Sequence, residues 1–153
     1  MSATMNIEPI GIVKSPVKEA VDEKWGNVVA EIHLLDSLAS GLQGIEQFSH
    51  VLVVFYMHES SFDPTGDLVR RPQGRADMPR VGIFAQRAKH RPNPIGITTV
   101  ELVAVEGNVL KVRGLDAIDG SPVLDIKPYM RVFDSAPNPT IPEWAERLMQ
   151  GYF

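Results

Sequence analysis

Three titratable residues alternate along one predicted strand in the last quarter of the sequence. Asp125, Lys127 and Tyr129 are spaced by two positions, and because successive side chains of a β-strand point to opposite faces, all three share one face. An acid, a base and a phenol on one strand face are typical of a functional site. A solvent-facing surface with an ion pair has the same pattern, so the residues alone leave both interpretations open.

A second candidate group is the pair of carboxylates at Asp116 and Asp119, between two predicted strands. Asp119 precedes Gly120, a turn signal that accounts for this residue at least as well as a function does. Asp116 is the better candidate, because an acid at a strand end can accept hydrogen bonds from ribose hydroxyls or an amino group. Neither carboxylate has a His partner at ligand spacing, so no metal site is predicted.

Positive charge is concentrated in residues 70–91, which hold seven basic residues and one acid, Asp77, in a chain of formal net charge −4. This asymmetry predicts an anionic partner that docks on one face, whereas a solvated loop with counterions is the alternative. The excess of Arg over Lys suits planar, bidentate contacts to phosphate. The residues predicted to contact nucleic acid are Arg70, Arg71, Arg75, Arg80 and Lys89.

The sequence RPNPIG at residues 91–96 is predicted to be rigid. Its two prolines each fix φ, the residue before each proline is held extended, and Gly96 permits close approach of another chain segment. Such a segment can present backbone groups to a nucleobase or an amino-acid moiety, although a tight connection between strands explains it as well. His58 and Glu59 follow an apolar strand and could line the same mouth, but a lone His there is more often structural.

The elements that must position these residues are predicted to be short strands. Glu106, Gly107 and Asn108 form a three-residue hairpin loop, Asp36 caps a short helix that runs to Leu42, and Thr140 starts a capping box for a helix over residues 142–150. Strands do not alternate with long helices, and the GxGxxG and P-loop patterns are absent. The prediction is an all-β fold, a small antiparallel β-barrel, closed or nearly closed, with one or two short helices. The predicted strands span residues 7–14, 28–34, 50–57, 81–86, 97–105, 109–115 and 123–129.

Length and composition narrow the class of protein. The chain has 153 residues and no cysteine, so one domain is expected, without a disulfide framework or a thiolate metal site. The first residues do not resemble a signal peptide, and no apolar run approaches the roughly 20 residues of a membrane span. We therefore expect a cytoplasmic protein whose single domain covers residues 1–153, with no additional C-terminal domain.

Two long motifs in the right order resemble the TsaA-like family, also called TrmO or YaeB. Residues 82–96 match its GxFAxRxxxRPNPIG segment, and residues 115–129 match its LDxxDGxPxLDIKPY segment. Further matches are IGIVKSP at residues 10–16 and FSH at residues 48–50. The resemblance covers nearly the whole chain between Ile7 and Tyr129.

The resemblance implies a homodimeric methyltransferase on a small β-barrel that uses S-adenosyl-L-methionine. It implies N6-methylation of threonylcarbamoyl-adenosine beside the anticodon of threonine tRNA, with the cofactor in the dimer cleft. Together with the rigid segment at residues 91–96, it predicts that the cofactor contacts Trp25, Gly26, His58, Glu59, Arg87, Arg91, Asn93, Ile97, Leu115, Asp116, Ala117, Ile118 and Asp119.

In such a reaction the acceptor nitrogen is a poor nucleophile, so a general base that removes its proton is plausible. We expect Asp125, or Tyr129 with its pKa lowered by Lys127, to take this role. Two other functions are compatible with the sequence: methylation of a small molecule, and binding of S-adenosylmethionine or RNA without catalysis.

Overall fold

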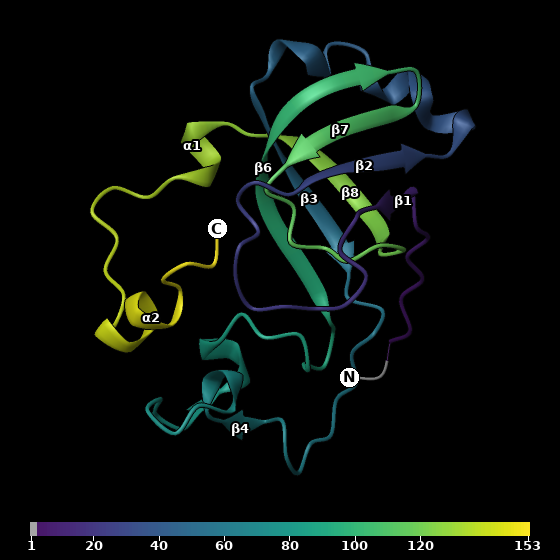
Figure 1. The fold of residues 1–153 in the computed structure, drawn as a ribbon. Coiled ribbons are helices and arrows are strands. Elements are labelled where there is room, and N and C mark those ends of the chain that lie inside the picture. Colours follow the sequence, from purple (N-terminus) through teal and green to yellow (C-terminus); the bar gives the residue numbers. More distant parts are fainter. Residues whose placement is uncertain (1–2) are drawn as a thin grey trace.

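Six antiparallel strands close into a barrel in the order β1-β2-β7-β6-β3-β8 in the computed structural model, which describes residues 3–153 (Figure 1). Residues 1 and 2, which were assigned to the same domain, lie outside the described part. The predicted barrel is confirmed, and it is closed. Its strands are β1 (Gly11–Lys14), β2 (Val29–Leu34), β3 (His50–Tyr56), β6 (Ile95–Glu106), β7 (Val109–Arg113) and β8 (Pro122–Pro128).

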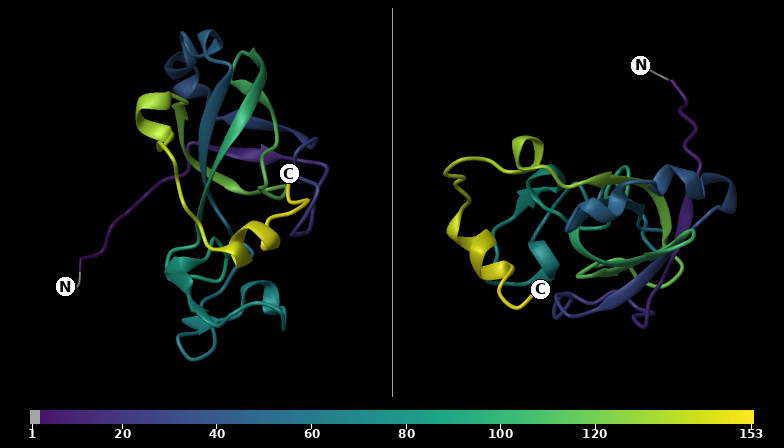
Figure 2. Two further views of the ribbon diagram at one scale, coloured as in Figure 1. Left: turned by 90° about the vertical axis from the view of Figure 1, so that its left-hand side faces the viewer. Right: turned by 90° about the horizontal axis from the view of Figure 1, so that it is seen from above.

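The core fills the barrel interior because apolar residues alternate along each strand. Val51, Val53 and Phe55 of β3 point inward, and the same period places buried Val, Leu and Ile side chains on β2 and β7. Seen from above, the strands form a closed ring (Figure 2), and the buried side chains fill its interior. The outward residues of the same strands are therefore free to form a surface.

The parts of the chain outside the barrel include the segment between β3 and β6 and the segment after β8 (Figures 1 and 2). Between β3 and β6, the strands β4 (Val69–Arg70) and β5 (Val81–Gly82) form a two-stranded sheet. After β8 come the helices α1 (Arg131–Asp134) and α2 (Glu143–Leu148). No helix within residues 3–153 is long and apolar enough to cross a membrane. The chain also forms 3-10 helices at Asp36–Leu42, Ile45–Gln47, Pro72–Gly74 and Ile83–Ala85.

Several boundaries differ from the prediction. The first strand starts at Gly11 rather than at residue 7, and Ile83–Ala85 form a 3-10 helix instead of extending β5. Glu106 pairs with Val109, so the hairpin loop has two residues, with Gly107 at φ +63°. The short helix α1 was not predicted.

Both predicted helix caps are wrong. Leu35 is the N-cap of the first 3-10 helix, and the carboxylate of Asp36 instead accepts a hydrogen bond from the Asn108 amide at 3.0 Å. Pro142, whose extended backbone precedes α2, occupies the N-cap position there, and no side chain caps that helix. A capping box at Thr140 therefore does not form.

Candidate functional site

Asp116 is held at both carboxylate oxygens. It lies between Leu115 and Ala117, which are buried in the core and fix the backbone at this point. The Thr98 hydroxyl donates to one oxygen of Asp116, and the Tyr152 hydroxyl donates to the other. Because two donors from distant parts of the chain meet on one carboxylate, Asp116 has a defined orientation.

Arg87 and Ile97 belong to the same group as Asp116. The Arg87 guanidinium donates to the Ile97 carbonyl oxygen at 2.7 Å, and Ile97 directly precedes Thr98 on β6. Burial raises the pKa of the Tyr152 phenol far above its ordinary value, and the nearby Asp116 carboxylate adds to this shift. The charge of Arg87 acts on the same phenol in the opposite direction. The structure thus brings together Arg87, Ile97 and Asp116, three of the predicted cofactor-binding residues.

Trp25 and Gly26 support this group from the side. Trp25 is 2 % exposed, and its indole N–H donates to the Val21 carbonyl at 3.0 Å, so the ring is part of the packing. A Cβ at Gly26 would lie 2.5 Å from the backbone carbon of Phe153, so only glycine allows this close approach. In the side view of Figure 2, the end of the chain lies beside the loop that contains these residues.

Asp119 faces a different set of partners. Its carboxylate accepts hydrogen bonds from the Ser15 backbone N–H at 2.9 Å and from the Lys18 ammonium at 2.8 Å. The Lys18 hydrogen bond, followed by that of Ser15, lowers the pKa of Asp119 below its ordinary value. These residues line an open depression of about 560 Å³ over β1 and β2, which does not include Asp116 or Arg87. Asp116 and Asp119, which belong to one predicted turn, therefore lie in two different environments.

His58 lies beside this turn. A Cβ on Gly120 would be 3.7 Å from His58 Nε2, which places the imidazole against the glycine. The other ring nitrogen, Nδ1, is buried and has no hydrogen-bond partner within the described residues 3–153. A buried polar atom without a partner is costly, so this nitrogen calls for a partner such as a ligand or an ordered water.

The remaining predicted cofactor residues have mostly structural contacts. The Arg91 guanidinium donates to the carbonyls of Gln86 and Ala88 at 2.9 and 3.1 Å, which braces the preceding loop. The Asn93 carbonyl accepts the Ile95 N–H at 2.7 Å. Glu59 is exposed. Three members of the turn, Leu115, Ala117 and Ile118, have buried side chains, so they can offer a ligand only their backbone.

The predicted catalytic residues lie on the outer face of the barrel. Lys127 and Asp125 form an ion pair at 2.8 Å, with side chains 64 % and 46 % exposed. The Lys127 ammonium thus contacts Asp125, and Tyr129 instead packs edge to face against His50 with ring centroids 6.4 Å apart. The ion-paired surface that the sequence left open is therefore present.

Asp125 is nevertheless connected by the sheet to Ile97 of the Asp116 group. Val54 of β3 is paired with Asp125 on one side and with Ile97 on the other. Directly opposed residues of neighbouring strands share a face and strands are about 4.8 Å apart, so Asp125 lies about 10 Å from Ile97. Asp125 thus shares an outward face with Ile97, whereas the Thr98 side chain that contacts Asp116 points to the opposite, inward face.

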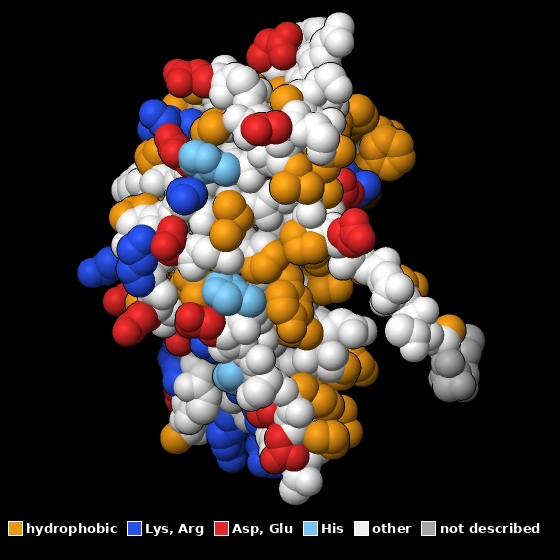
Figure 3. Space-filling view, turned by 90° about the vertical axis from the view of Figure 1, so that its right-hand side faces the viewer, with side chains coloured by type: hydrophobic (Ala, Val, Ile, Leu, Met, Phe, Trp, Pro, Cys, Tyr) orange, Lys and Arg blue, Asp and Glu red, His pale blue; other side chains and the backbone are white. Residues whose placement is uncertain are grey.

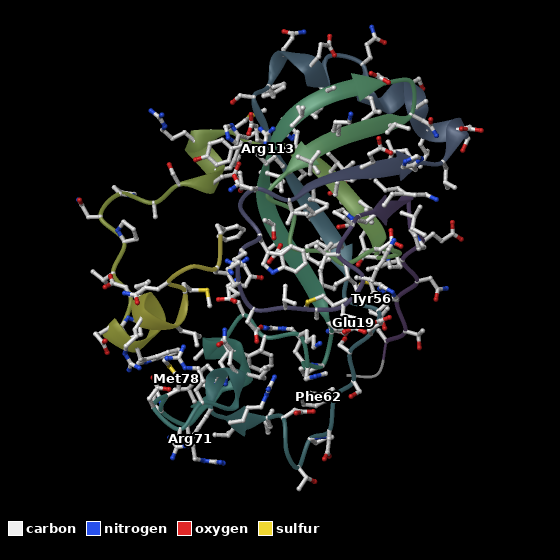
Figure 4. The ribbon with its side chains drawn as sticks, in the orientation of Figure 1. Glu19, Tyr56, Phe62, Arg71, Met78 and Arg113 are labelled. Atoms are coloured by element: carbon white, nitrogen blue, oxygen red, sulfur yellow. The ribbon has the colours of Figure 1, made fainter. Side chains whose placement is uncertain are left out.

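The basic residues surround the small β4–β5 sheet, away from the barrel. Arg71 donates to the Met78 carbonyl, and the two residues lie side by side at the foot of the molecule, far from Arg113 on the barrel (Figure 4). Arg75 pairs with Asp77 at 2.7 Å. Arg70 is the least available, because its guanidinium is partly buried, with Nε 3.8 Å from Asp67.

Arg147 was not among the predicted basic residues, although it joins their network. It comes from α2 and contacts the Asp77 carboxylate at 2.6 Å. Arg80 and Lys89 complete the basic set, and Arg80 reaches the Val69 carbonyl at 3.3 Å. Helix α2 is therefore tied to the basic residues around β4 and β5 through Asp77, which pairs with both Arg75 and Arg147.

An apolar groove occupies another face of the barrel. On this face, hydrophobic side chains gather in a stripe (Figure 3). The groove has a volume of about 300 Å³ and carries no acid or base except His33. It lacks charged groups for chemistry and is separate from the residues above. Its lining residues are Pro9, Gly11, Ile12, His33, Leu35 and Pro122.

Sequence reasoning missed Thr98 and Tyr152 as partners of Asp116. Thr98 had a usable signal, because it is a polar residue at an inward position of a barrel strand, opposite buried Val53. Tyr152 had none, since nothing in the local sequence indicates that residues near the end of the chain return to this turn. Lys18 follows the recognised residues 10–16 closely, but its contact with Asp119 joins distant segments.

Comparison with known proteins identifies relatives over most of the chain. Residues 16–135 match the family model for the tRNA-methyltransferase O N-terminal domain. An S-adenosyl-L-methionine-binding protein of Archaeoglobus fulgidus is 42% identical over 139 residues, covering 85% of this chain and 93% of the relative. The tRNA (adenine(37)-N6)-methyltransferase of Escherichia coli is 38% identical over 147 residues, covering 89% of this chain and 62% of the enzyme.

Solved structures give the same grouping. The crystal structure of TrmO from P. aeruginosa superposes with a TM-score of 0.75 at 31% identity, covering 94% of this chain and 63% of that one. The chain thus spans less than two thirds of the length of the Escherichia coli enzyme and of this solved structure, and nearly all of the archaeal relative.

Proposed function

Because the chain belongs to the family of the tRNA-methyltransferase O N-terminal domain, we propose that it binds S-adenosylmethionine and methylates N6 of an adenine in tRNA. The relatives' names support both parts, since they specify binding of this cofactor and methylation of adenine 37 in tRNA. The observation that carries the proposal is the meeting of Arg87, Ile97 and Asp116 around one end of β6.

The residues present fit the chemistry of this cofactor. S-adenosylmethionine carries a ribose diol, an adenine, an ammonium group and a carboxylate. Asp116 accepts hydrogen bonds, Arg87 offers a positive charge, and His58 has a buried ring nitrogen without a partner within residues 3–153. Carboxylates suit hydroxyl and ammonium donors, and Arg suits a carboxylate. We therefore assign cofactor binding to Asp116, Arg87, His58 and the backbone of the 115–119 turn.

When bound, the cofactor supplies a methyl carbon on a sulfonium, which a nucleophile can attack in line. The protein must then hold the acceptor nitrogen in place and accept its proton. Asp125 lies about 10 Å from Ile97 across one strand, and its ion pair with Lys127 at 2.8 Å orients its carboxylate. We assign the general base to Asp125, with Tyr129 as the alternative.

The acceptor that we propose is threonylcarbamoyl-adenosine beside the anticodon of threonine tRNA. The basic residues support a polyanionic substrate, because Arg71 and Arg80 lie beside β4 and β5 and phosphate contacts provide most nucleic-acid affinity. Such a substrate is consistent with action in the cytoplasm. This proposal places the acceptor nitrogen in tRNA, whereas the alternative enzyme class would methylate a small molecule.

We infer further that two copies associate. Phe84 is 78 % exposed, and Val132 and Phe133 of α1 are 82 % and 80 % exposed. Val132 and Phe133 are neighbours on α1, and a contiguous exposed apolar patch often belongs to an interface. Sedimentation velocity of the whole chain tests this inference. A dimer that becomes monomeric on Phe133→Asp supports it, and a monomer at micromolar concentrations overturns it.

The decisive experiment has a binding arm and a chemical arm. Calorimetry with S-adenosylhomocysteine measures cofactor-site affinity, and labelled S-adenosylmethionine with total tRNA measures methyl transfer. Mass spectrometry of the nucleosides then identifies the product. Binding without transfer to tRNA would favour a non-catalytic module, and transfer to a small-molecule fraction alone would favour the other enzyme class.

The assignment of the base has its own test. Asp125→Asn and Tyr129→Phe should keep the affinity for S-adenosylhomocysteine, because neither residue contacts the Asp116 group. Asp125→Asn should slow methyl transfer by about 10²-fold or more, as loss of a general base does. Full activity in both variants would remove this strand from the mechanism.

A further inference from the structure

Residues 151–153 run alongside residues 24–26 and reach the cofactor group. The Lys24 N–H donates to the Gly151 carbonyl, and the Trp25 N–H donates to the Tyr152 carbonyl, both at 2.8 Å. The missing side chain of Gly26 leaves room for the backbone of Phe153. Two backbone hydrogen bonds and one close contact thus fix the position of Tyr152.

The fixed position of Tyr152 places its side chain against Asp116. Its hydroxyl donates to one carboxylate oxygen, while Thr98 donates to the other. The ring packs edge to face against Phe153 with centroids 4.8 Å apart. An ionised carboxylate has about four lone-pair sites, so two donors orient Asp116 and still leave sites for a ligand.

The hydroxyl matters beyond the packing of the ring. A buried hydroxyl costs free energy unless it is hydrogen-bonded, and a phenylalanine would pack equally well without that cost. Burial and the Asp116 charge raise the pKa of Tyr152, so the phenol stays protonated and remains a donor at physiological pH.

We propose that Tyr152 is a positioning residue of the cofactor site: with Thr98, it holds the Asp116 carboxylate in the orientation that receives hydroxyl or amino donors of the nucleoside cofactor. This inference rests on the proposed function, because it takes Asp116 as a cofactor ligand. It adds to the site a residue from the end of the described chain, outside the segment that matches the family model.

The test is a double-mutant cycle read by calorimetry with S-adenosylhomocysteine. Tyr152→Phe should weaken binding about five- to tenfold, the equivalent of one typical hydrogen bond, since one of the two donors that orient Asp116 is lost. In an Asp116→Asn background, the same change should weaken binding less than twofold, because no carboxylate remains to be oriented. A role in packing alone would give the same loss in both backgrounds.

A matched control is Tyr56→Phe, which removes a phenol from an exposed position at the end of β3 and should leave binding unchanged. If Tyr152→Phe does not fold, Thr98→Val gives the second measurement, with the same expected dependence on Asp116. If the parent binds and Tyr152→Phe binds with the same affinity, the role of Tyr152 is overturned and the proposed function stands. Failure of the parent to bind overturns both.

Discussion

Gly96→Ala is expected to destabilise the barrel, because the ring of Phe55 lies over Gly96. The two residues are directly paired between β3 and β6. A Cβ on residue 96 would lie 2.5, 2.8 and 2.9 Å from three carbon atoms of that ring. Real Cβ atoms do not approach carbon so closely, so the ring or the strand must move.

The size of the effect follows from two opposing contributions. Phe55 is 4 % exposed and sits in the packed core, and overpacking such a site costs about 1–3 kcal/mol. Gly96 does not have positive φ, so alanine also restricts the unfolded chain, which stabilises the protein by about 0.4–1 kcal/mol. The net loss should be about 1–2 kcal/mol, or about 2–8 °C in Tm for a domain of this size.

Urea unfolding followed by circular dichroism measures this loss. Gly41→Ala is the matched control, because a Cβ there meets no atom within 4 Å among residues 3–153 and φ is not positive. It should change stability by less than about 0.5 kcal/mol.

A double mutant tests the cause. Phe55→Leu in the Gly96→Ala background should recover part of the loss, because the smaller side chain removes the ring atoms that collide. If Gly96→Ala matches Gly41→Ala in stability, or if Phe55→Leu gives no recovery, then the close packing of this pair is not what requires glycine.

Three further predictions concern other parts of the molecule. Lys18 and the Ser15 N–H lower the pKa of Asp119 below 3.8, so its stabilising contribution is present above that pH and is lost as pH falls below it; urea midpoints for Asp119→Asn should lie below the parent at pH 7 and converge with it in acid. Arg80→Ala and Lys89→Ala should each reduce the slope of log tRNA affinity against log salt by about 1 in filter binding, and an unchanged slope would exclude them as phosphate contacts. Gly11→Ala places a Cβ 2.5 Å from the His33 carbonyl, a backbone atom that cannot rotate away, so its loss of stability should equal or exceed that of Gly96→Ala.

The barrel could be predicted because its strands carry the information locally. Alternating or continuously apolar runs of β-branched residues identify β2, β3 and β6, and the absence of long helices between them excludes a parallel sheet. Strand ends were less predictable, because they depend on partners. Ile7 begins a plausible strand, but the first ladder pairs of β1 join Gly11 to Leu34 and to Val123.

The candidate site was predictable only for residues that lie in or next to a recognised sequence motif. Arg87 and Asp116 lie in the two recognised motifs, Ile97 directly follows the first of them, and the structure brings the three together. The hydroxyl of Tyr152 also donates to Asp116, but the two residues are far apart in sequence and no local pattern predicts their contact. The Asp125–Lys127 ion pair shows the opposite case, since the period of two placed both on one face but could not distinguish a salt bridge from a catalytic pair.

The closure between β1 and β8 has a consequence for how the barrel forms. This seam has two ladder pairs, Gly11 with Val123 and Ile12 with Pro122, whereas the ladder between β3 and β6 has seven. Its partners are the most distant in sequence of any in the sheet, so closing the loop costs more entropy and fewer bonds offset it. The seam should form last during folding and open first in the native state. Amide hydrogens of Ile10 and Val13, which bond across it to Val123 and Ser121, should therefore exchange with solvent faster than those of β3.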